Sequence, residues 1–329
     1  MIISRTPLRI SFVGGGSDLP AFFSQEPGAV VTTAIDKYIY INVNKKFDHK
    51  IRASYSVTEI VDHVDELQHE LIREAMTVVE IEGVIEITSI SDIPSSGTGL
   101  GSSSTYSVGL LNALYAYTGR YAGAERLARE SCMIEIERCG KPIGKQDQYI
   151  AGYGGLQYIQ FNPDGSVFVD PIICSGTTRA RLQERLLMLY TGLTRSADGV
   201  LAEQQKNTES DHARRDALRA MTMQARDLRE ELCRDNIDSF GEILHAAWQM
   251  KMTLASGISN ARINDWYERA RSHGAIGGKI LGAGGGGRLL LYAPPERHGE
   301  ILSALPELRH VPFRFEPQGS KIIYIEEGV

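Results

Sequence analysis

Cysteine is scarce in this sequence, and the features that mark several common protein classes are absent. The four cysteines, Cys132, Cys139, Cys174 and Cys233, form no CxxC pair and no zinc-ligand spacing, so reduced and mostly buried thiols are expected. The formal net charge of -6 argues against a general nucleic-acid-binding surface. No apolar stretch is long enough to cross a bilayer, and the first residues lack the cationic and apolar pattern of a signal peptide. A cytoplasmic protein is therefore expected.

Three nucleotide-binding signatures are also missing. Lys145 and Lys279 each follow a glycine but precede neither serine nor threonine, so no GxxxxGK[ST] motif is present and a P-loop NTPase is not expected. The glycine run at 282–287 matches GxGxxG, but it leads into a strand-like segment instead of opening a helix, which argues against a dinucleotide-binding fold. The HRD and DFG elements of protein kinases do not occur.

The composition is otherwise ordinary for a folded chain of 329 residues, with 42% hydrophobic and 23% charged residues. Strand-like and helix-like segments alternate without repeats, which predicts an α+β fold. The predicted domains are residues 1–178 and 179–329. Strands are expected at residues 2–13, 30–44, 50–56, 84–91, 156–161, 167–172 and 186–190. Helices are expected at residues 103–117 and 124–138 and over much of the segment that ends near residue 273.

The most informative segment is PSSGTGLGSSS at residues 94–104, which separates a β-like segment from an apolar helix. Its glycines, Gly97, Gly99 and Gly101, let the backbone approach an anion with N–H groups pointing inward. The helix that follows adds the positive end of its dipole, and the serine hydroxyls can donate hydrogen bonds or bind a metal. The segment is therefore predicted to bind phosphate.

Three motifs, in order along the chain, resemble those of the GHMP small-molecule kinases, the family of galactokinase, homoserine kinase and mevalonate kinase. They are TPLRISFVGGGSD at 6–18, PSSGTGLGSSST at 94–105 and GGKILGAGGGGRLL at 277–290. Each motif alone is weakly specific, whereas the three together span nearly the whole chain. The resemblance implies an ATP-binding N-terminal domain like ribosomal protein S5 domain 2, with an unusual left-handed βαβ crossover, and a ferredoxin-like C-terminal domain.

The same resemblance implies a site for ATP and magnesium. Ser103 matches the family serine that binds magnesium, and Glu135, twelve residues before Asp147, is the predicted second ligand. Magnesium suits such a site because it takes few protein oxygens and bridges nucleotide phosphates. Glu137 competes with Glu135, although two residues along a helix turn it to another side, and a solvated carboxylate is the alternative for either. The residues expected at the ATP phosphates are Ser96, Gly97, Gly99, Leu100, Gly101, Ser102, Ser103 and Ser104.

Asp147 matches the family's catalytic aspartate, which accepts the proton of the substrate hydroxyl during phosphoryl transfer. Arg9 matches the cationic partner of that aspartate and would neutralise transferred charge. From the residues alone, Asp147 could equally be a turn aspartate.

Substrate contacts are predicted in the first and third motifs. Asp18 matches the acidic residue that holds sugar hydroxyls in related kinases, with a turn-initiating aspartate as the alternative. Arg195, and Lys145 beside the catalytic turn, are candidates for binding a phosphate on the sugar, although surface cations are usually only solvated. The full set of predicted substrate contacts is Gly15, Gly16, Ser17, Asp18, Gly284, Gly285 and Arg195.

Within the family, RISFVGGGSDLPAFF and IGKQDQYIAGYGG are similar to the heptose 7-phosphate kinases of the heptose and fucose branch. Galactokinases instead carry an acidic residue and a histidine where this chain has Gly15 and Gly16. The resemblance implies transfer from ATP to the anomeric hydroxyl of D-glycero-D-manno-heptose 7-phosphate, giving the 1,7-bisphosphate for nucleotide-heptose and surface polysaccharide synthesis.

Two alternatives stay open: another sugar 1-kinase such as an L-fucokinase-like enzyme, and a non-catalytic sugar and ATP sensor. The expected partner is a small sugar phosphate, with no nucleic acid and no membrane. The sequence leaves the oligomeric state open, with a homodimer among the alternatives.

Overall fold

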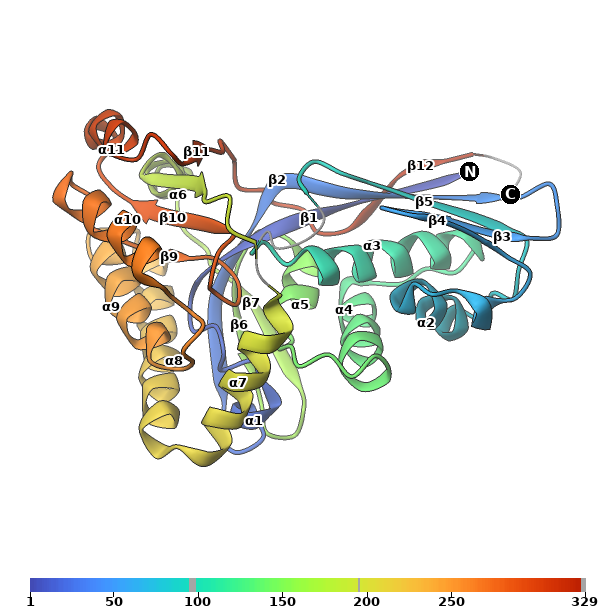
Figure 1. Cartoon of the computed structure of the whole chain (residues 1–329), viewed down its shortest axis with the longest axis horizontal. Helices are drawn as coiled ribbons and strands as arrows, with labels where there is room; N and C mark the ends of the chain where they lie inside the picture. The colour runs from blue at the N-terminus through green and yellow to red at the C-terminus, as the bar shows by residue number, and fades with distance from the viewer. Residues whose placement is uncertain (95–98, 195, 327–329) are drawn as a thin grey trace.

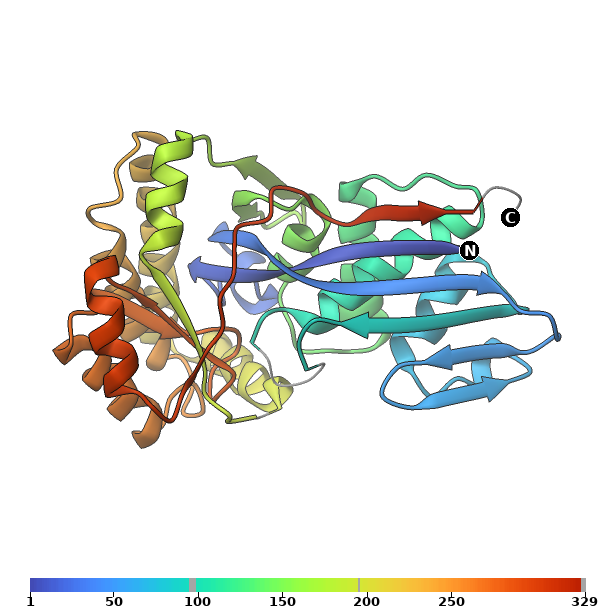
Figure 2. The same ribbon diagram turned by 90° about the horizontal axis from the view of Figure 1, so that it is seen from above.

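The computed structural model describes residues 1–94, 99–194 and 196–326. Two β-sheets with their helices form the two ends of an elongated molecule (Figure 1). Strands and helices mix in both halves, so the α+β fold predicted from the sequence is confirmed. The first two strands are long and extend from the larger sheet to the half of the molecule that contains the smaller sheet (Figure 2).

The larger sheet has eight strands among the described residues, in the order β12-β1-β2-β5-β3-β4, with β6 on β2 and β7 on β6. All neighbours pair antiparallel except β3 and β5. The strands are β1 (Ile2–Val13), β2 (Gly28–Lys45), β3 (Ile51–Ser54), β4 (Thr58–Val61), β5 (Ile85–Ser91), β6 (Leu156–Phe161), β7 (Val167–Pro171) and β12 (Lys321–Ile325).

Strand β1 has the bounds that its sequence predicts, and its second half is buried on both faces. Leu8, Ile10 and Phe12 lie in the hydrophobic core, while Arg9 and Ser11 alternate with them and point to the other side of the strand. Burial on both faces explains why the segment shows little polar alternation. The period of two places Arg9 and Ser11 on one face, where they can share a site.

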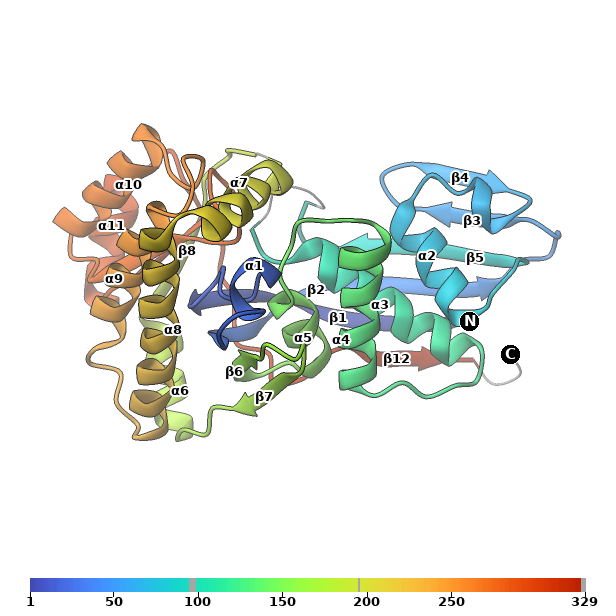
Figure 3. The ribbon, with the colours of Figure 1, turned by 90° about the horizontal axis from the view of Figure 1, so that it is seen from below.

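Four helices cover one face of the larger sheet (Figure 3). They are α2 (Glu70–Val79), α3 (Ser102–Tyr117), α4 (Ala124–Cys132) and α5 (Gln146–Tyr153). Helix α3 packs against β1 and β2 and also against the other three helices, so it is buried on nearly every side. Figure 2 looks onto the opposite face of this sheet, where the strands near the two chain termini are uncovered in the described part of the chain, whereas α8 (His212–Cys233) packs against the parts of β1 and β2 that extend toward the other half.

The helix predicted at residues 124–138 is not a single α-helix. Helix α4 ends at Cys132, and a π-helix follows at Met133–Arg138. A π-turn widens a helix locally and is frequent at functional sites. The widened turn carries Glu135, which is fully buried, whereas Glu137 is exposed.

The smaller sheet has the order β11-β8-β10-β9 among the described residues, and all its neighbours pair antiparallel. Its strands are β8 (Leu186–Tyr190), β9 (Gly277–Ile280), β10 (Arg288–Tyr292) and β11 (Arg309–His310). The remaining helices are α1 (Pro20–Phe23), α6 (Gly176–Glu184), α7 (Ala197–Ser210), α8 (His212–Cys233), α9 (Phe240–Met252), α10 (Ala261–Ser272) and α11 (His298–Ala304). Trp248 and Trp266 lie in the core of this half.

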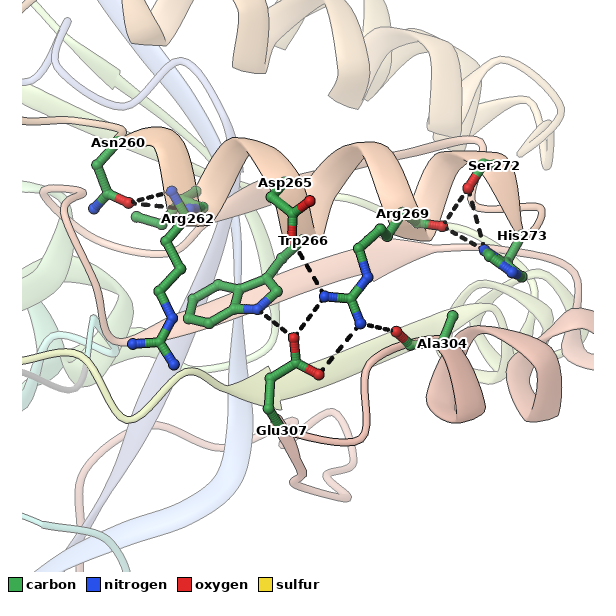
Figure 4. A network of polar contacts seen from close by, with 10 residues as sticks. Asn260, Arg262, Asp265, Trp266, Arg269, Ser272, His273, Ala304 and Glu307 are labelled. Atoms are coloured by element: carbon green, nitrogen blue, oxygen red, sulfur yellow. Dashed lines mark hydrogen bonds and ion pairs between the residues drawn. The ribbon is translucent and has the colours of Figure 1, made fainter.

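A polar network joins α10 to the segment after α11 (Figure 4). The indole Nε1 of Trp266 donates to Glu307 Oε1 at 2.8 Å, and Arg269 Nη1 donates to the same oxygen at 2.6 Å. The hydrogen bond from Arg269 is the largest cause that lowers the pKa of Glu307 to about 2. The network therefore attaches the segment between α11 and β11 to helix α10.

The chain returns to the larger sheet at its end, because β12 pairs with the first residues of β1. The predicted boundary near residue 178 stays a prediction, but residues 321–325 lie in the sheet of the first half rather than the second. This pairing spans nearly the full length of the chain, so no local pattern could indicate it.

Two expectations on cysteines and membranes can be compared with the structure. The four cysteines are free, as expected, but Cys132 alone among them is buried and Cys233 is exposed, so the expectation of mostly buried thiols is wrong. Among the described helices, none is both long and apolar enough to cross a membrane.

Candidate active site

A cavity of about 630 Å³ lies where the two halves meet, and residues of all three glycine-rich motifs line it. The first motif contributes the end of β1 and the loop after it, the second the start of α3, and the third the loop after β9. The π-helix, the segment before α5, and helices α7 and α9 complete the wall.

Arg9 and Asp147 form a bidentate salt bridge in the wall of this cavity. Arg9 Nε donates to Asp147 Oδ1 at 2.6 Å, and Arg9 Nη2 donates to Asp147 Oδ2 at 2.7 Å. Arg9 Nη1 donates to the carbonyl oxygen of Gly99 at 2.7 Å. Parallel N–H···O bonds of this kind fix both side chains in orientation. Both residues line the cavity, and the aspartate, 22% exposed against 5% for the arginine, is the more accessible of the two.

Asp18 is brought beside Asp147 by the first glycine loop. Asp18 Oδ1 accepts the backbone N–H of Gly16 at 2.8 Å, and Oδ2 accepts that of Gln146 at 3.3 Å. Burial raises the pKa of Asp18, the two backbone hydrogen bonds oppose that rise, and the nearby Asp147 adds to it. Gly144 is required here because a Cβ on it would lie 1.9 Å from Asp18 Oδ2.

Gly15, Gly16 and Ser17 have different roles in the first loop. Gly15 and Gly16 line the cavity. Ser17 is buried, and its hydroxyl donates to the carbonyl oxygens of Gly14 and Ala29, so it holds the loop together. Ser17, a predicted substrate contact, therefore stabilises the loop and is not among the residues that line the cavity.

The second motif forms the N-terminal end of α3. Gly99 and Gly101 have φ angles of 71° and 74°, in the left-handed region that favours glycine, and α3 begins at Ser102. Gly101 and residues 102–104 line the cavity, as does Gly99. Leu100 is buried, and its carbonyl oxygen accepts the N–H of Arg9 at 3.2 Å. Ser96 and Gly97 lie outside the described residues.

The predicted metal ligands, Ser103 and Glu135, are in contact. Ser103 Oγ donates to Glu135 Oε2 at 2.8 Å, and Gln148 Nε2 donates to Glu135 Oε1 at 2.8 Å. Burial raises the pKa of Glu135 to about 7, although these hydrogen bonds act in the opposite direction. The π-helix therefore presents a buried carboxylate to the start of α3, inside the cavity wall.

The third motif contacts the second through glycine. A Cβ on Gly282 would lie 2.7 Å from Gly99 Cα, and one on Gly284 would lie 2.6 Å from the carbonyl oxygen of Ile258. Gly282 lines the cavity, but Gly284 and Gly285 do not. Both glycines, predicted as substrate contacts, therefore lie against the backbone of the protein: the N–H of Gly285 also donates to the carbonyl oxygen of Ile258, at 2.8 Å.

The cations predicted for a sugar phosphate are not in the described part of the cavity. Lys145 Nζ donates to the carbonyl oxygen of Gly165 at 3.0 Å, and Lys145 does not line the cavity. Arg195 lies outside the described residues.

Lys251 and Lys279 are buried and line the cavity, and neither is among the site residues predicted from the sequence. Lys279 lies within the third motif, where the predicted contacts are Gly284 and Gly285. Lys251 lies in an unremarkable segment of α9, where no sequence signal marks it.

Comparisons with known proteins agree with this geometry. Residues 61–155 match the model for the GHMP kinases N terminal domain, and residues 228–308 match that for GHMP kinases C terminal. The chain is 29% identical to D-glycero-alpha-D-manno-heptose 7-phosphate kinase of Campylobacter jejuni, over 92% of this chain and 93% of that protein.

A second relative and a solved structure extend the comparison. The bifunctional fucokinase/GDP-fucose pyrophosphorylase of Arabidopsis thaliana is 26% identical over 92% of this chain, which spans 31% of that longer protein. The crystal structure of a D-glycero-D-manno-heptose 1-phosphate kinase from Bacteroides thetaiotaomicron superposes with a TM-score of 0.82 at 23% identity, covering 99% of this chain and 100% of the other, and shows the shared fold. The chain therefore belongs to the GHMP kinase family and is an ATP-dependent phosphotransferase.

Proposed function

We propose that this enzyme transfers the γ-phosphoryl group of ATP to the anomeric hydroxyl of D-glycero-D-manno-heptose 7-phosphate and so forms the 1,7-bisphosphate. The observation that carries the proposal is the Arg9–Asp147 pair, which faces the same cavity as Asp18 and the glycine-serine loop. The similarity to the Campylobacter jejuni heptose 7-phosphate kinase over nearly the whole of both chains supports this choice of acceptor.

The phosphates of ATP would bind at the N-terminal end of α3. Backbone N–H groups there have no partner within the helix, and the helix dipole favours an anion. Gly99 and Gly101 allow the backbone to come close to the phosphates, and residues 102–104 line the same space.

Ser103 and Glu135 fit a magnesium ion. Their oxygens are 2.8 Å apart, and the buried Glu135 carboxylate, whose pKa is raised, has no cation beside it among the described residues. No group of three or more His, Cys, Asp or Glu side chains is placed to hold a metal in the described part of the chain. Magnesium would accordingly have few protein ligands, and when bound it would neutralise charge on the phosphates.

Asp147 would accept the proton of the attacking hydroxyl, because it lines the cavity while Arg9 fixes both of its oxygens. Asp18, held by two backbone N–H groups beside Asp147, would accept hydrogen bonds from neighbouring sugar hydroxyls. Such positioning supplies most of the catalysis in phosphoryl transfer. The product would serve nucleotide-activated heptose synthesis for surface polysaccharide.

A second candidate is an L-fucokinase-like activity. The similarity to the plant bifunctional fucokinase over 92% of this chain favours it, because the same catalytic groups could act on the anomeric hydroxyl of an unphosphorylated sugar.

Release of ADP across a panel of sugars and sugar phosphates distinguishes these candidates. We expect the highest kcat/KM with D-glycero-D-manno-heptose 7-phosphate. A higher kcat/KM with L-fucose would favour the second candidate and contradict the first.

A further inference from the structure

Two lysine side chains are buried in the cavity wall without a carboxylate partner. Both are 5% exposed. The ammonium group of Lys251, on α9, donates to the carbonyl oxygen of Gly15 and to Gln204 Oε1, both at 3.1 Å. That of Lys279, on β9, donates to the carbonyl oxygen of Phe12 at 3.0 Å. These acceptors are neutral, and no described carboxylate forms an ion pair with either lysine. Buried charges are normally paired, because burial without a counter-charge is unfavourable.

The two ammonium groups have hydrogen-bonding capacity to spare. Each carries three N–H donors; with described residues, Lys251 uses two of them and Lys279 uses one. Ser11, which lines the same cavity and is 5% exposed, has a hydroxyl with no partner among the described residues. The wall thus offers positive charge and several donors to a ligand with many acceptor oxygens.

The backbone groups that accept from the two lysines lie near the end of β1 and in the loop after it. The carbonyl groups of Phe12 and Gly15, which hold the lysines, follow Arg9 by three and six residues. With a rise of about 3.3 Å per residue, Phe12 lies about 10 Å beyond Arg9 along the strand. These spacings are between backbone positions. The lysines and the Arg9–Asp147 pair line one cavity of about 630 Å³, which has room for a sugar with its anomeric hydroxyl at Asp147 and its phosphate at the lysines.

We propose that Lys251 and Lys279 bind the phosphate group that the acceptor already carries, and that they make the enzyme select phosphorylated sugars. This inference rests on the proposed function. The Asp18 carboxylate interacts electrostatically with both lysines but forms an ion pair with neither, so a phosphate dianion would be their ion-pair partner and would accept their remaining N–H donors. An unphosphorylated sugar leaves both ammonium groups without an ion-pair partner. Lys145 cannot take this role from its present position, because it points to Gly165 outside the cavity.

The preference should depend on pH. Burial lowers the pKa of Lys251 to about 8 and that of Lys279 to about 7. The charge of Lys251 and then that of Arg9 lower the pKa of Lys279 further, Arg9 also lowers that of Lys251, and Asp18 opposes both shifts. Asp147, which also faces this space, is paired with Arg9. Each lysine is protonated below its pKa, whereas a phosphate monoester is mostly dianionic above about pH 6. The preference for a phosphorylated acceptor should therefore be largest near pH 6 to 7 and fall as the pH rises past about 8.

The test compares kcat/KM for D-glycero-D-manno-heptose 7-phosphate and for D-glycero-D-manno-heptose in the wild type, Lys251→Met and Lys279→Met. Loss of one charge-assisted contact should lower the ratio of the two values by about 10- to 100-fold in each variant. Lys206→Met is the matched control, because Lys206 is exposed on α7, and its ratio should equal that of the wild type. The ratio is taken within one preparation, so a partly unfolded variant does not change it.

Three other outcomes are possible, and each would contradict either the inference or the proposed function. An equal loss with both acceptors would show that the lysines act on the transferred phosphoryl group and would refute the inference. A wild-type preference for the phosphorylated sugar that survives both substitutions would also refute it, while leaving the proposed function intact. A wild-type enzyme that converts only unphosphorylated sugars would contradict the proposed acceptor and, with it, the phosphate subsite.

Discussion

Replacing Asp147 with asparagine should stop phosphoryl transfer while ATP still binds. The carboxylate of Asp147 accepts two hydrogen bonds from the guanidinium of Arg9, at 2.6 and 2.7 Å. Asparagine keeps one acceptor oxygen but places an amide NH2 group against the second N–H donor. Hydrogen bonds to charged groups contribute about 1.5–3 kcal/mol each, so the free energy of unfolding should fall by about that amount. The side chain of Arg9 is 5% exposed, so water can replace the lost bond only in part.

The kinetic effect should be larger than the effect on stability. Loss of a positioned general base lowers rates by about 10²- to 10⁴-fold, which corresponds to about 3–5 kcal/mol in the activation free energy. ATP affinity should stay close to that of the wild type, because Asp147 is not part of the glycine-serine loop. Steady-state turnover gives kcat, and isothermal titration calorimetry gives the Kd of ATP.

Asp227→Asn is a suitable control, because Asp227 is exposed on α8, and it should behave as the wild type. Near-normal turnover of Asp147→Asn would refute the role of this carboxylate as base. A parallel loss of ATP binding would show instead that it positions the nucleotide.

Three further substitutions test other parts of the site and the fold. Glu135→Gln should raise the magnesium concentration needed for half-maximal turnover on the order of tenfold or more; a magnesium titration that matches the wild type would contradict its role as a ligand. Gly144→Ala places a Cβ 1.9 Å from Asp18 Oδ2 and should raise KM for the sugar but not for ATP, whereas Gly176→Ala, with nothing within 4 Å, should change neither; equal kinetics of the two variants would refute this. Glu307→Gln should lower stability most above about pH 4.5, because the pKa of Glu307 is lowered to about 2 in the folded protein and the stabilisation is lost as the pH falls through that value; a difference in unfolding free energy that does not change with pH would contradict it.

Local patterns predicted much of the fold. The strand at Ile2–Val13 and the helix that starts at Ser102 follow from residue type and period alone. The π-helix at Met133–Arg138 could not be predicted, because the same residues suit an α-helix and only packing decides which form is adopted. The pairing of β12 with β1 joins the two ends of the chain, so it depends on tertiary structure.

The sequence indicates some residues of the candidate site and gives no sign of others. Motifs indicated Arg9, Asp147 and Asp18, which are in fact adjacent in the structure. Lys251 and Lys279 were missed because a lysine in a sequence is normally solvated, and its burial is visible only once the helix or strand that carries it is packed against β1.

The most direct test of the account is the position of the new phosphate after incubation with ATP, magnesium and D-glycero-D-manno-heptose 7-phosphate, observed by phosphorus NMR. The account predicts one product that carries its second phosphate on the anomeric carbon, with an equal amount of ADP. No conversion of this sugar phosphate, or a new phosphate on any other carbon, would contradict the account.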